Sequence, residues 1–307
     1  MKLEDINKVA IIGAGIMGHG IALTFGLAGY QVSLHDTSPE VLSRALKHIG
    51  KNLALFVETE LISPEEQAAA LDNIKTEIDL KQSVEKCDFV IEAIPEILDL
   101  KKELFKKLDK LAPPHAILAT NTSSLSGSAM AEATDRPDKV VVAHWFNPPH
   151  LVPLVEVVKG TWTSEETLYL TRDLIIKIGK TPVVLEKEAP GFVANRIQAA
   201  IMKEALKILD KGIASAEDID MAIKAGPGFR LPSLGIFEIA DLGGIDTWYW
   251  ASASMSRSGT PTPILKEKMD RGELGVKSGK GFYDYTGRDI ESIIEKRDRE
   301  FIKRLKK

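Results

Sequence analysis

Residues 9–18 read VAIIGAGIMG, an apolar run that leads directly into a glycine-rich segment. A Gly-x-Gly-x-x-Gly motif between a strand pattern and a helix pattern is typical of dinucleotide-binding folds. Gly13 permits a tight turn there, Gly15 lets the backbone approach a pyrophosphate, and Gly18 lets the helix pack close to the strand. This stretch predicts the first strand, turn and helix of a doubly wound α/β domain.

A second apolar run, residues 31–36, ends in an acid at Asp36. In such folds an acid about 20 residues after the glycines accepts hydrogen bonds from the ribose hydroxyls. Ile16 and Met17 begin a helix whose free N–H groups face the pyrophosphate. Asp36 would repel the 2′-phosphate of NADP, and residues 37–39 offer no cation to compensate. We therefore expect NAD as the cofactor; the alternative is a glycine turn with a purely structural role.

The chain has 307 residues, a formal net charge of −4 and a single cysteine, Cys87. The length allows two domains, and the charge balance gives no reason to expect nucleic acid or an anionic membrane as a partner. No apolar stretch approaches the roughly 20 residues that span a bilayer. One cysteine excludes an intrachain disulfide and fits a reducing compartment, so we expect a cytoplasmic protein. We expect no leader peptide before the first strand, and no metal site.

Up to about Lys187 short apolar runs alternate with helical patterns, which is typical of parallel βα units. A longer excursion at residues 39–73 has the pattern of a helical pair, and a capping box beginning at Ser63 predicts the start of its second helix. Further helices are expected at residues 96–111 and 164–178. After the first two strands, further strands are expected at residues 74–80, 89–94, 116–120, 140–143, 155–159 and 182–185.

Beyond Pro190 the strand signal ends. A long helix is predicted over residues 190–209, with Pro190 as its start. Helical patterns continue at residues 217–225, 234–255, 263–271 and 290–307. The change of pattern predicts a Rossmann-type NAD-binding domain at residues 1–187 and an all-α domain at residues 188–307.

Two ionisable residues stand out at the predicted carboxyl edge of the sheet. His144 follows the apolar run 140–143, and Glu156 lies within the next apolar run. Pro148 and Pro149 cannot continue a helix or a paired central strand, so the chain is expected to turn between the two residues. The turn could bring the carboxylate to the imidazole, a pair that suits removal of an alcohol proton. The alternative is a core histidine satisfied by backbone and a glutamate on a solvated strand face.

Five motifs occur in order along the chain: GAGIMG, NTSSL, HWFNPP, LVEVV and PGFVANR. Together they resemble the 3-hydroxyacyl-CoA dehydrogenase family over nearly the whole chain. The resemblance implies a Rossmann domain followed by a helical dimerisation domain, and therefore a homodimer. It also implies oxidation of an L-3-hydroxyacyl thioester with NAD in fatty acid metabolism, with a substrate of short or medium chain length.

The same resemblance implies roles for individual residues. His144 matches the general base, and Glu156 matches the acid that orients and charges it. Ser123 and Asn195 would hydrogen-bond the reacting oxygen or the thioester carbonyl. Residues that match cofactor contacts, besides the glycine motif and Asp36, are Glu96, Lys101, Ser123, Asn147 and Lys277.

Departures from the family pattern bear on the substrate. Asn52 and Thr59 stand where the family has a serine and a lysine that contact coenzyme A. Arg44, Lys47 and Lys51 form a basic stripe that could meet coenzyme A phosphates instead, or could simply be solvated.

Two other functions stay open. The passage Leu151-Val152-Pro153 is similar to one in relatives that oxidise free hydroxy acids such as carnitine or L-gulonate, so the substrate could be a free 3-hydroxy acid. A non-catalytic NAD-binding protein is the third possibility. That function predicts loss of the proton-transfer residues, yet His144, Glu156, Ser123 and Asn195 are all present.

Overall fold

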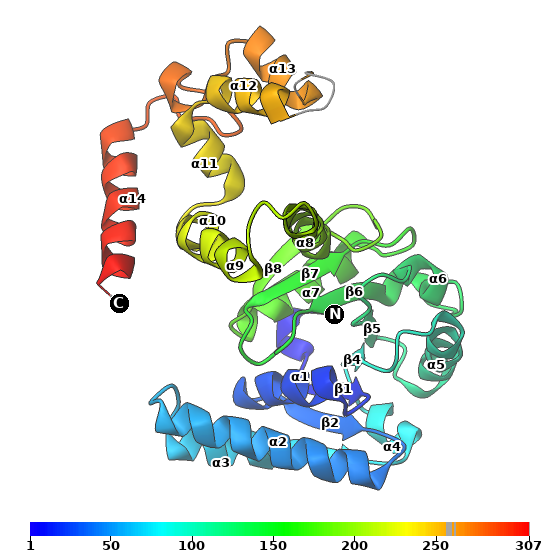
Figure 1. Cartoon of the computed structure of the whole chain (residues 1–307). Coiled ribbons are helices and arrows are strands. Elements are labelled where there is room, and N and C mark those ends of the chain that lie inside the picture. Colours follow the sequence, from blue (N-terminus) through cyan, green and yellow to red (C-terminus); the bar gives the residue numbers. More distant parts are fainter. Residues whose placement is uncertain (256–259, 261, 307) are drawn as a thin grey trace. The chain divides into compact units, whose positions relative to one another are not determined.

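The chain forms two compact units, Met1–Ala199 and Ala200–Lys307, in a computed structural model (Figure 1). The structure describes residues 1–255, 260 and 262–306. The division between the units falls within one helix, α8 (Ala194–Asp210).

The first unit is built on one eight-stranded sheet with the order β3-β2-β1-β4-β5-β6-β7-β8. Neighbouring strands are parallel throughout, except that β6 and β7 are antiparallel. The strands are β1 (Lys8–Ile12), β2 (Gln31–His35), β3 (Ile74–Glu77), β4 (Phe89–Glu92), β5 (Ile117–Thr120), β6 (Val140–Trp145), β7 (Leu154–Val158) and β8 (Thr181–Leu185). All eight predicted strands are therefore present.

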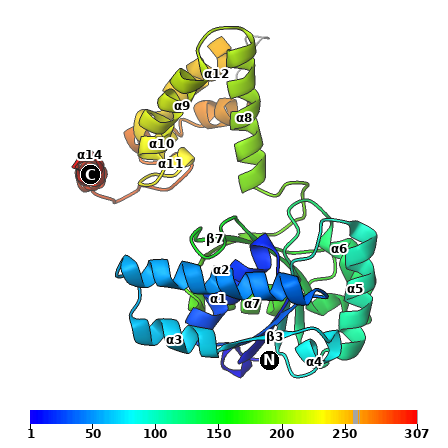
Figure 2. The same ribbon diagram turned by 60° about the horizontal axis from the view of Figure 1, so that its bottom comes forward.

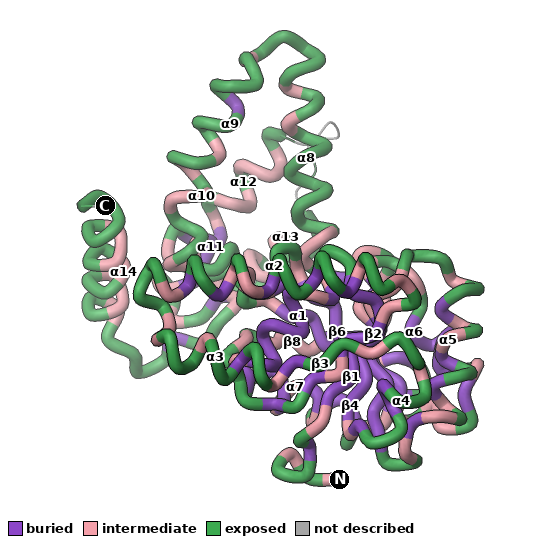
Figure 3. Tube along the Cα trace, turned by 90° about the horizontal axis from the view of Figure 1, so that it is seen from below, coloured by how far each residue is buried: buried purple, intermediate pink, exposed green. Residues whose placement is uncertain are grey.

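Helices cover both faces of this sheet. One apolar core joins one face to α1 (Ile16–Leu27), α2 (Pro39–Glu58), α3 (Pro64–Asp72) and α7 (Glu165–Lys177). A second core joins the other face to α4 (Leu80–Val84), α5 (Leu98–Leu111) and α6 (Gly127–Ala131). Buried residues accordingly concentrate in the strands, while α2 and α3 keep an exposed outer face (Figure 3). The predicted doubly wound sheet followed by an all-α region is confirmed.

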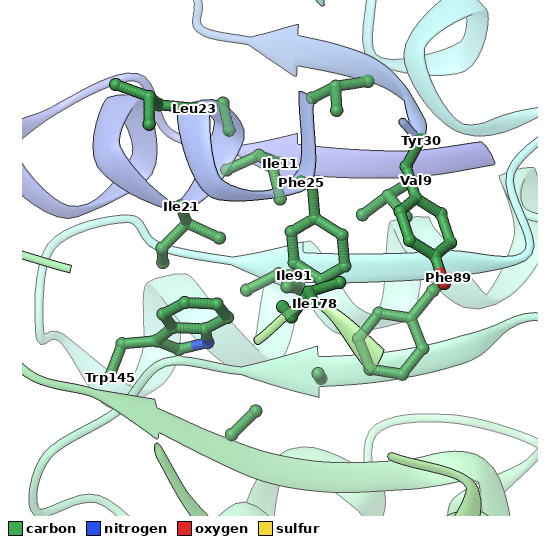
Figure 4. Packing of buried hydrophobic residues seen from close by; sticks show 14 of the residues in the cluster. Val9, Ile11, Ile21, Leu23, Phe25, Tyr30, Phe89, Ile91, Trp145 and Ile178 are labelled. Atoms are coloured by element: carbon green, nitrogen blue, oxygen red, sulfur yellow. The ribbon is translucent and has the colours of Figure 1, made fainter. Parts of the chain in front are cut away.

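Aromatic side chains fill the core between α1 and the sheet (Figure 4). The Phe25 ring centroid lies 5.6 Å from that of Tyr30 and 6.0 Å from that of Trp145. Burying a side chain such as Phe25 contributes about 1.5–3 kcal/mol. This contact fixes α1 against β6, and therefore fixes the glycine-rich turn relative to the strand that carries His144.

The glycine-rich turn depends on backbone conformations and approaches that a side chain would prevent. Gly13 has φ of 103°, and a Cβ there would lie 2.6 Å from the carbonyl oxygen of Ala93. A Cβ at Gly18 would lie 1.7 Å from the carbonyl oxygen of Gly13, so only glycine lets α1 start this close to β1. A Cβ at Gly15 would meet no atom within 4 Å, which leaves the backbone there open to a ligand.

The expectation of parallel units throughout the first half is wrong for one connection. Residues 146–153 join β6 to β7 without a helix, and the two strands run antiparallel. A parallel crossover needs about a dozen residues or more, so this short connection allows only a reversal. The predicted turn between His144 and Glu156 lies at this connection.

The helical pair predicted after β2 is present as α2 and α3, which lie side by side (Figure 2). The Ser63 hydroxyl accepts from the Glu66 N–H at 3.2 Å, and the Glu66 carboxylate accepts from the Ser63 N–H at 2.7 Å. The predicted strand at residues 74–80 is too long, because Asp79 caps a helix that begins at Leu80.

The second unit consists of helices in its described residues, apart from isolated β-bridges at Lys280. The helices after α8 are α9 (Ala216–Ala225), α10 (Pro227–Arg230), α11 (Ile236–Gly243), α12 (Ile245–Met255), α13 (Pro263–Asp270) and α14 (Ile290–Leu305). The helix predicted over residues 234–255 is in fact two helices, since Gly244 has φ of 93° and interrupts the run. The end of the last predicted helix, Lys307, lies outside the described residues.

The predicted start of the long helix at Pro190 is also wrong. The helix α8 begins at Ala194. Gly191 and Phe192 before it adopt φ of 75° and 48°, in the left-handed region. That backbone conformation is incompatible with a continuous right-handed helix from Pro190.

Candidate active site

The antiparallel pairing of β6 and β7 brings His144 and Glu156 together. They are direct cross-strand neighbours, and the Nδ1 atom of His144 lies 2.8 Å from Oε2 of Glu156. The two residues are only 4% and 1% exposed. Because a carboxylate only accepts, the ring donates from Nδ1, which leaves Nε2 to accept a proton from a ligand.

The two carboxylate oxygens of Glu156 accept hydrogen bonds from different groups. While Oε2 accepts from His144, Oε1 accepts from the backbone N–H groups of Val193 and Ala194, both at 2.9 Å. Burial alone would raise the pKa of Glu156, but the hydrogen bonds from His144, Ala194 and Val193 outweigh it and hold the pKa below its usual value. The carboxylate therefore stays ionised and can stabilise an imidazolium.

Two aromatic rings flank the histidine. The ring centroids of Phe146 and Phe192 lie 4.5 and 5.5 Å from that of His144. Phe192 precedes α8, so the segment that leads into this helix both shields the pair and donates to Glu156. Asn195 follows in the first turn of α8, where it is half-buried. Asn147 is exposed in the connection after β6.

Ser123 lies after β5 in a loop that Glu96 holds. The Oε1 atom of Glu96 accepts from the backbone N–H of Ser123 at 2.9 Å and from the hydroxyl of Thr122 at 2.5 Å. Burial raises the pKa of Glu96, but the Thr122 hydroxyl, Lys101 and the Ser123 N–H together bring it below its usual value. A charged acceptor thus fixes the backbone of the loop that presents Ser123.

Lys101 lies beneath this loop rather than on the helix surface. It is 1% exposed, and its Nζ atom lies 3.2 Å from Oε2 of Glu96 and 2.5 Å from Oε1 of Glu92. The predicted cofactor contacts of Glu96 and Lys101 stay predictions. What the structure describes is a carboxylate–ammonium–carboxylate chain that ends at the Ser123 loop.

Glu92 is a residue that the sequence reasoning missed. It is fully buried at the end of β4, and its carboxylate also accepts from Thr120 Oγ1 at 2.6 Å and from the Ile94 N–H at 2.7 Å. An acid at the end of an apolar strand was a usable signal, because an unpaired buried charge is costly. The same signal drew attention to Glu156.

Five of the residues predicted to hold a dinucleotide line one cavity of about 790 Å³, whereas Gly18, Glu96, Lys101, Ser123, Asn147 and Lys277 do not line it. Gly13, Gly15, Ile16, Met17 and Asp36 all contribute to it. The Asp36 carboxylate also accepts from the Ala14 N–H at 3.0 Å and the Ser38 N–H at 3.1 Å, which fixes its orientation at the end of β2. Glu103 and Lys107 of α5 line the same cavity and were not predicted.

Lys277 belongs to the second unit. Its Nζ atom lies 2.8 Å from Oδ1 of Asp246, and the lysine side chain is about half exposed, at 47%. Its predicted contact with the cofactor stays a prediction.

Among the described residues, no group of three or more His, Cys, Asp or Glu side chains could hold a metal ion. Nor do those residues include a helix of the length and apolar character needed to cross a membrane.

Comparison with known proteins identifies related sequences over both units. The NAD binding domain of the 3-hydroxyacyl-CoA dehydrogenases matches residues 8–189, and the C-terminal domain of the same family matches residues 191–285. The probable 3-hydroxybutyryl-CoA dehydrogenase of Bacillus subtilis is 39% identical over 287 residues, covering 92% of this chain and 98% of that protein.

Two other relatives are named for substrates that differ from each other. The 5-formyl-3-hydroxy-2-methylpyridine 4-carboxylate 5-dehydrogenase of Mesorhizobium japonicum is 31% identical over 301 residues, covering 97% of this chain and 96% of that protein. The crystal structure of the 3-hydroxyacyl-CoA dehydrogenase of Archaeoglobus fulgidus superimposes with a TM-score of 0.79 and 33% identity, covering 95% of this chain and 97% of that one.

Proposed function

The chain belongs to the 3-hydroxyacyl-CoA dehydrogenase family, a family of NAD-dependent oxidoreductases, and we propose that it oxidises an L-3-hydroxyacyl-CoA to the 3-ketoacyl-CoA. The observation that carries this proposal is the buried pair of His144 and Glu156, with Nε2 of the histidine left free for a ligand. A short or medium acyl chain is part of the proposal.

The first unit fits NAD. Gly15 leaves its backbone open, the α1 N-terminus offers free N–H groups, and Asp36 lines the same cavity. Gly13, Gly15, Ile16, Met17 and Asp36 would hold the adenosine and pyrophosphate portions. When bound, NAD supplies the acceptor for the hydride that leaves the alcohol carbon.

His144 acts in this proposal as the general base. Its Nε2 atom takes the proton from the substrate hydroxyl while the carbon gives up its hydride, so that the alcohol becomes a ketone. Glu156 stabilises the imidazolium that results, because its Oε2 atom already accepts from Nδ1. Ser123 and Asn195 hydrogen-bond the reacting oxygen or the thioester carbonyl.

A direct assay tests the proposal. The purified protein is given L-3-hydroxybutyryl-CoA with NAD, or acetoacetyl-CoA with NADH, and the absorbance of NADH is followed. Turnover in both directions is expected. Activity confined to free hydroxy acids would overturn the thioester proposal while leaving the oxidoreductase class intact.

A free hydroxy acid is the second candidate substrate, and two observations favour it. The Mesorhizobium relative is named for a small aromatic carboxylate rather than for a thioester. Asn52 and Thr59 also stand where the family has coenzyme A contacts. Assays with L-carnitine and L-gulonate distinguish this candidate from the first.

We also propose a homodimer formed by the helical domain, residues 188–307, and a cytoplasmic location. The location is supported by the single cysteine, Cys87, which is free and buried. The dimer is supported by exposed apolar side chains on the second unit, among them Phe237 and Trp250.

A further inference from the structure

Three histidines from three separate elements gather outside the residues described above. His19 lies on α1, His48 on α2 and His150 in the connection between β6 and β7. The ring centroid of His19 lies 5.3 Å from that of His48 and 6.4 Å from that of His150. The helices α1 and α2 pack against each other in the first unit (Figure 2), so the cluster is part of its packed structure.

The position of His150 is fixed by its surroundings. Lys180 donates from Nζ to the carbonyl oxygens of Pro149 at 2.6 Å and Val152 at 2.9 Å, which holds the loop on both sides of the histidine. A Cβ at Gly20 would lie 3.0 Å from Nδ1 of His150, so glycine lets the ring approach α1. The Phe56 ring centroid of α2 lies 6.0 Å from that of His150. The imidazole is therefore held between two helices.

The hydrogen bonding of the cluster leaves capacity for a ligand. His19 donates from Nδ1 to the Gly15 carbonyl at 2.8 Å, which leaves Nε2 free to become a second donor on protonation. Nδ1 of His150 is buried without a hydrogen-bond partner in the described residues. His48 is exposed on α2.

Positive groups neighbour two of the three histidines. Arg44, Lys47 and Lys51 flank His48 along α2, and none of them takes part in an ion pair within the described part of the chain. Lys180 faces His150. No carboxylate among the described residues pairs with any of the three histidines, so the cluster has no counter-charge of its own.

The pKa values of His19 and His150 are lowered. Burial lowers the pKa of His19, the hydrogen bond to the Gly15 carbonyl partly offsets this, and the nearby His48 adds to the lowering. Burial also lowers the pKa of His150, with His19 and Lys180 adding to it. A bound anion would reverse the effect, because an opposite charge favours the protonated ring.

The cluster lies at the edge of the sheet where this fold binds ligands. The helix α1 starts after the carboxyl end of β1, and His150 follows the carboxyl end of β6, which also carries His144. In doubly wound sheets, ligands bind outside the carboxyl ends of the strands. A substrate whose hydroxyl meets His144 approaches from this edge.

We propose that His19, His48 and His150 together bind an anionic oxygen group of the substrate and thereby contribute to substrate selection. The group is a carboxylate or a phosphate, which a free hydroxy acid and a coenzyme A ester respectively would supply. This inference rests on the proposed dehydrogenase function, because the anion belongs to the molecule whose alcohol is oxidised.

Steady-state kinetics of variants tests the inference and identifies the source of the anion. The variants are His19→Gln, His48→Gln, His150→Gln and the triple substitution. The matched control is His115→Gln, whose ring pairs with Asp88 just before β4, at the opposite edge of the sheet. KM and kcat are measured with L-3-hydroxybutyryl-CoA, L-carnitine and L-gulonate, and the Kd of NADH is measured by fluorescence.

Loss of a charge-assisted hydrogen bond should raise KM roughly tenfold or more in the triple variant, with kcat and the Kd of NADH nearly unchanged. The substrate class whose KM rises identifies the source of the anion. Unchanged KM values for every substrate that is turned over would overturn the inference. So would a parallel weakening of NADH binding, because the anion would then belong to the dinucleotide.

Calorimetry decides the inference even if none of these substrates is turned over. Malonate and free coenzyme A are titrated into the wild-type protein and the variants in buffers of different ionisation enthalpy. Binding of at least one probe is expected, with proton uptake that disappears in the triple variant and with higher affinity at about pH 6 than at about pH 8. The exposed His48→Gln variant gives the same readout if the triple variant folds poorly. Binding that is absent, or identical in all variants, would refute the site, whereas missing turnover alone refutes only the proposed reaction.

Discussion

His144 offers a ligand only one nitrogen, because Nδ1 donates to Glu156. Replacement of His144 by Gln keeps a hydrogen-bonding side chain but removes the base. We expect kcat to fall by about 10²–10⁴-fold, with the Kd of NADH nearly unchanged. Steady-state assays measure kcat, and a fluorescence titration measures the Kd of NADH. Undiminished turnover would show that another group takes the proton.

We expect Asp36 to favour NAD over NADP, because its carboxylate would repel the 2′-phosphate of NADP. Its carboxylate lines the large cavity of the first unit and is oriented by Ala14 and Ser38. Replacement by Ser removes the charge, so we expect the ratio of kcat/KM for NAD over NADP to decrease. This ratio is measured by varying NAD and NADP separately at one fixed concentration of the substrate. A constant ratio would assign the preference to a different residue.

Lys101 compensates two carboxylates inside the first unit. Lys101→Met leaves Glu92 buried and uncompensated, so we expect a loss of about 3–5 kcal/mol in the free energy of unfolding. Lys106→Met, on the exposed face of the same helix, is the control and should change it by less than about 0.5 kcal/mol. Urea unfolding gives both values, and adding Glu92→Gln to Lys101→Met should recover part of the loss. Equal stability of the two single variants would contradict the described pairing.

The approach of α1 to β1 depends on Gly18. A methyl group there would overlap the carbonyl oxygen of Gly13, so Gly18→Ala must displace the helix. We expect a lower melting temperature and weaker NADH binding. Gly50→Ala is the matched control, because it lies within α2 with no atom within 4 Å of a Cβ, and it should stabilise the protein by up to about 1 kcal/mol. If Gly18→Ala changed neither the melting temperature nor NADH binding, the helix would not depend on glycine at this position.

The elements that the sequence predicted well are those with local signals. The first strand, turn and helix follow from the glycine spacing, and α3 starts where the Ser63 capping box requires. The elements predicted poorly depend on distant groups or on a single backbone angle. The start of α8 is set by Glu156 through residues 193 and 194, and the break between α11 and α12 depends on Gly244.

The residues of the candidate site also divide into those that the sequence predicted and those that it did not. His144 and Glu156 were found because a charge inside an apolar run needs a partner, and because Pro148 and Pro149 predict a turn between the two residues. Burial of Lys101 could not be predicted, since the helix around it is crowded with charge. The three-histidine cluster was missed because its members lie on separate elements and no spacing in the sequence connects them.

The second unit presents apolar side chains that suit a subunit interface. Phe237 and Trp250 are 51% and 65% exposed, and Phe237 and Trp248 line an apolar cavity of about 200 Å³. Exposed apolar surface of this kind often marks a protein contact. It supports the proposed homodimer.

Sedimentation equilibrium at micromolar protein tests this oligomeric state. We expect twice the mass of one chain, and Phe237→Glu should shift the equilibrium towards the monomer because it places a charge on the apolar face. Leu61→Glu, on an exposed turn of the first unit, is the control and should leave the mass unchanged. A wild-type protein with the mass of one chain would rule out the dimer.

The hydrogen bonds to the second oxygen of Glu156 restrict which sequences this fold tolerates. At Val193 and Ala194 the carboxylate accepts only from main-chain N–H groups. This contact therefore places no requirement on the side chains at these two positions. Proline is the exception, because it has no N–H to donate. Homologues that retain the histidine–glutamate pair should therefore vary at these two positions yet exclude this one amino acid.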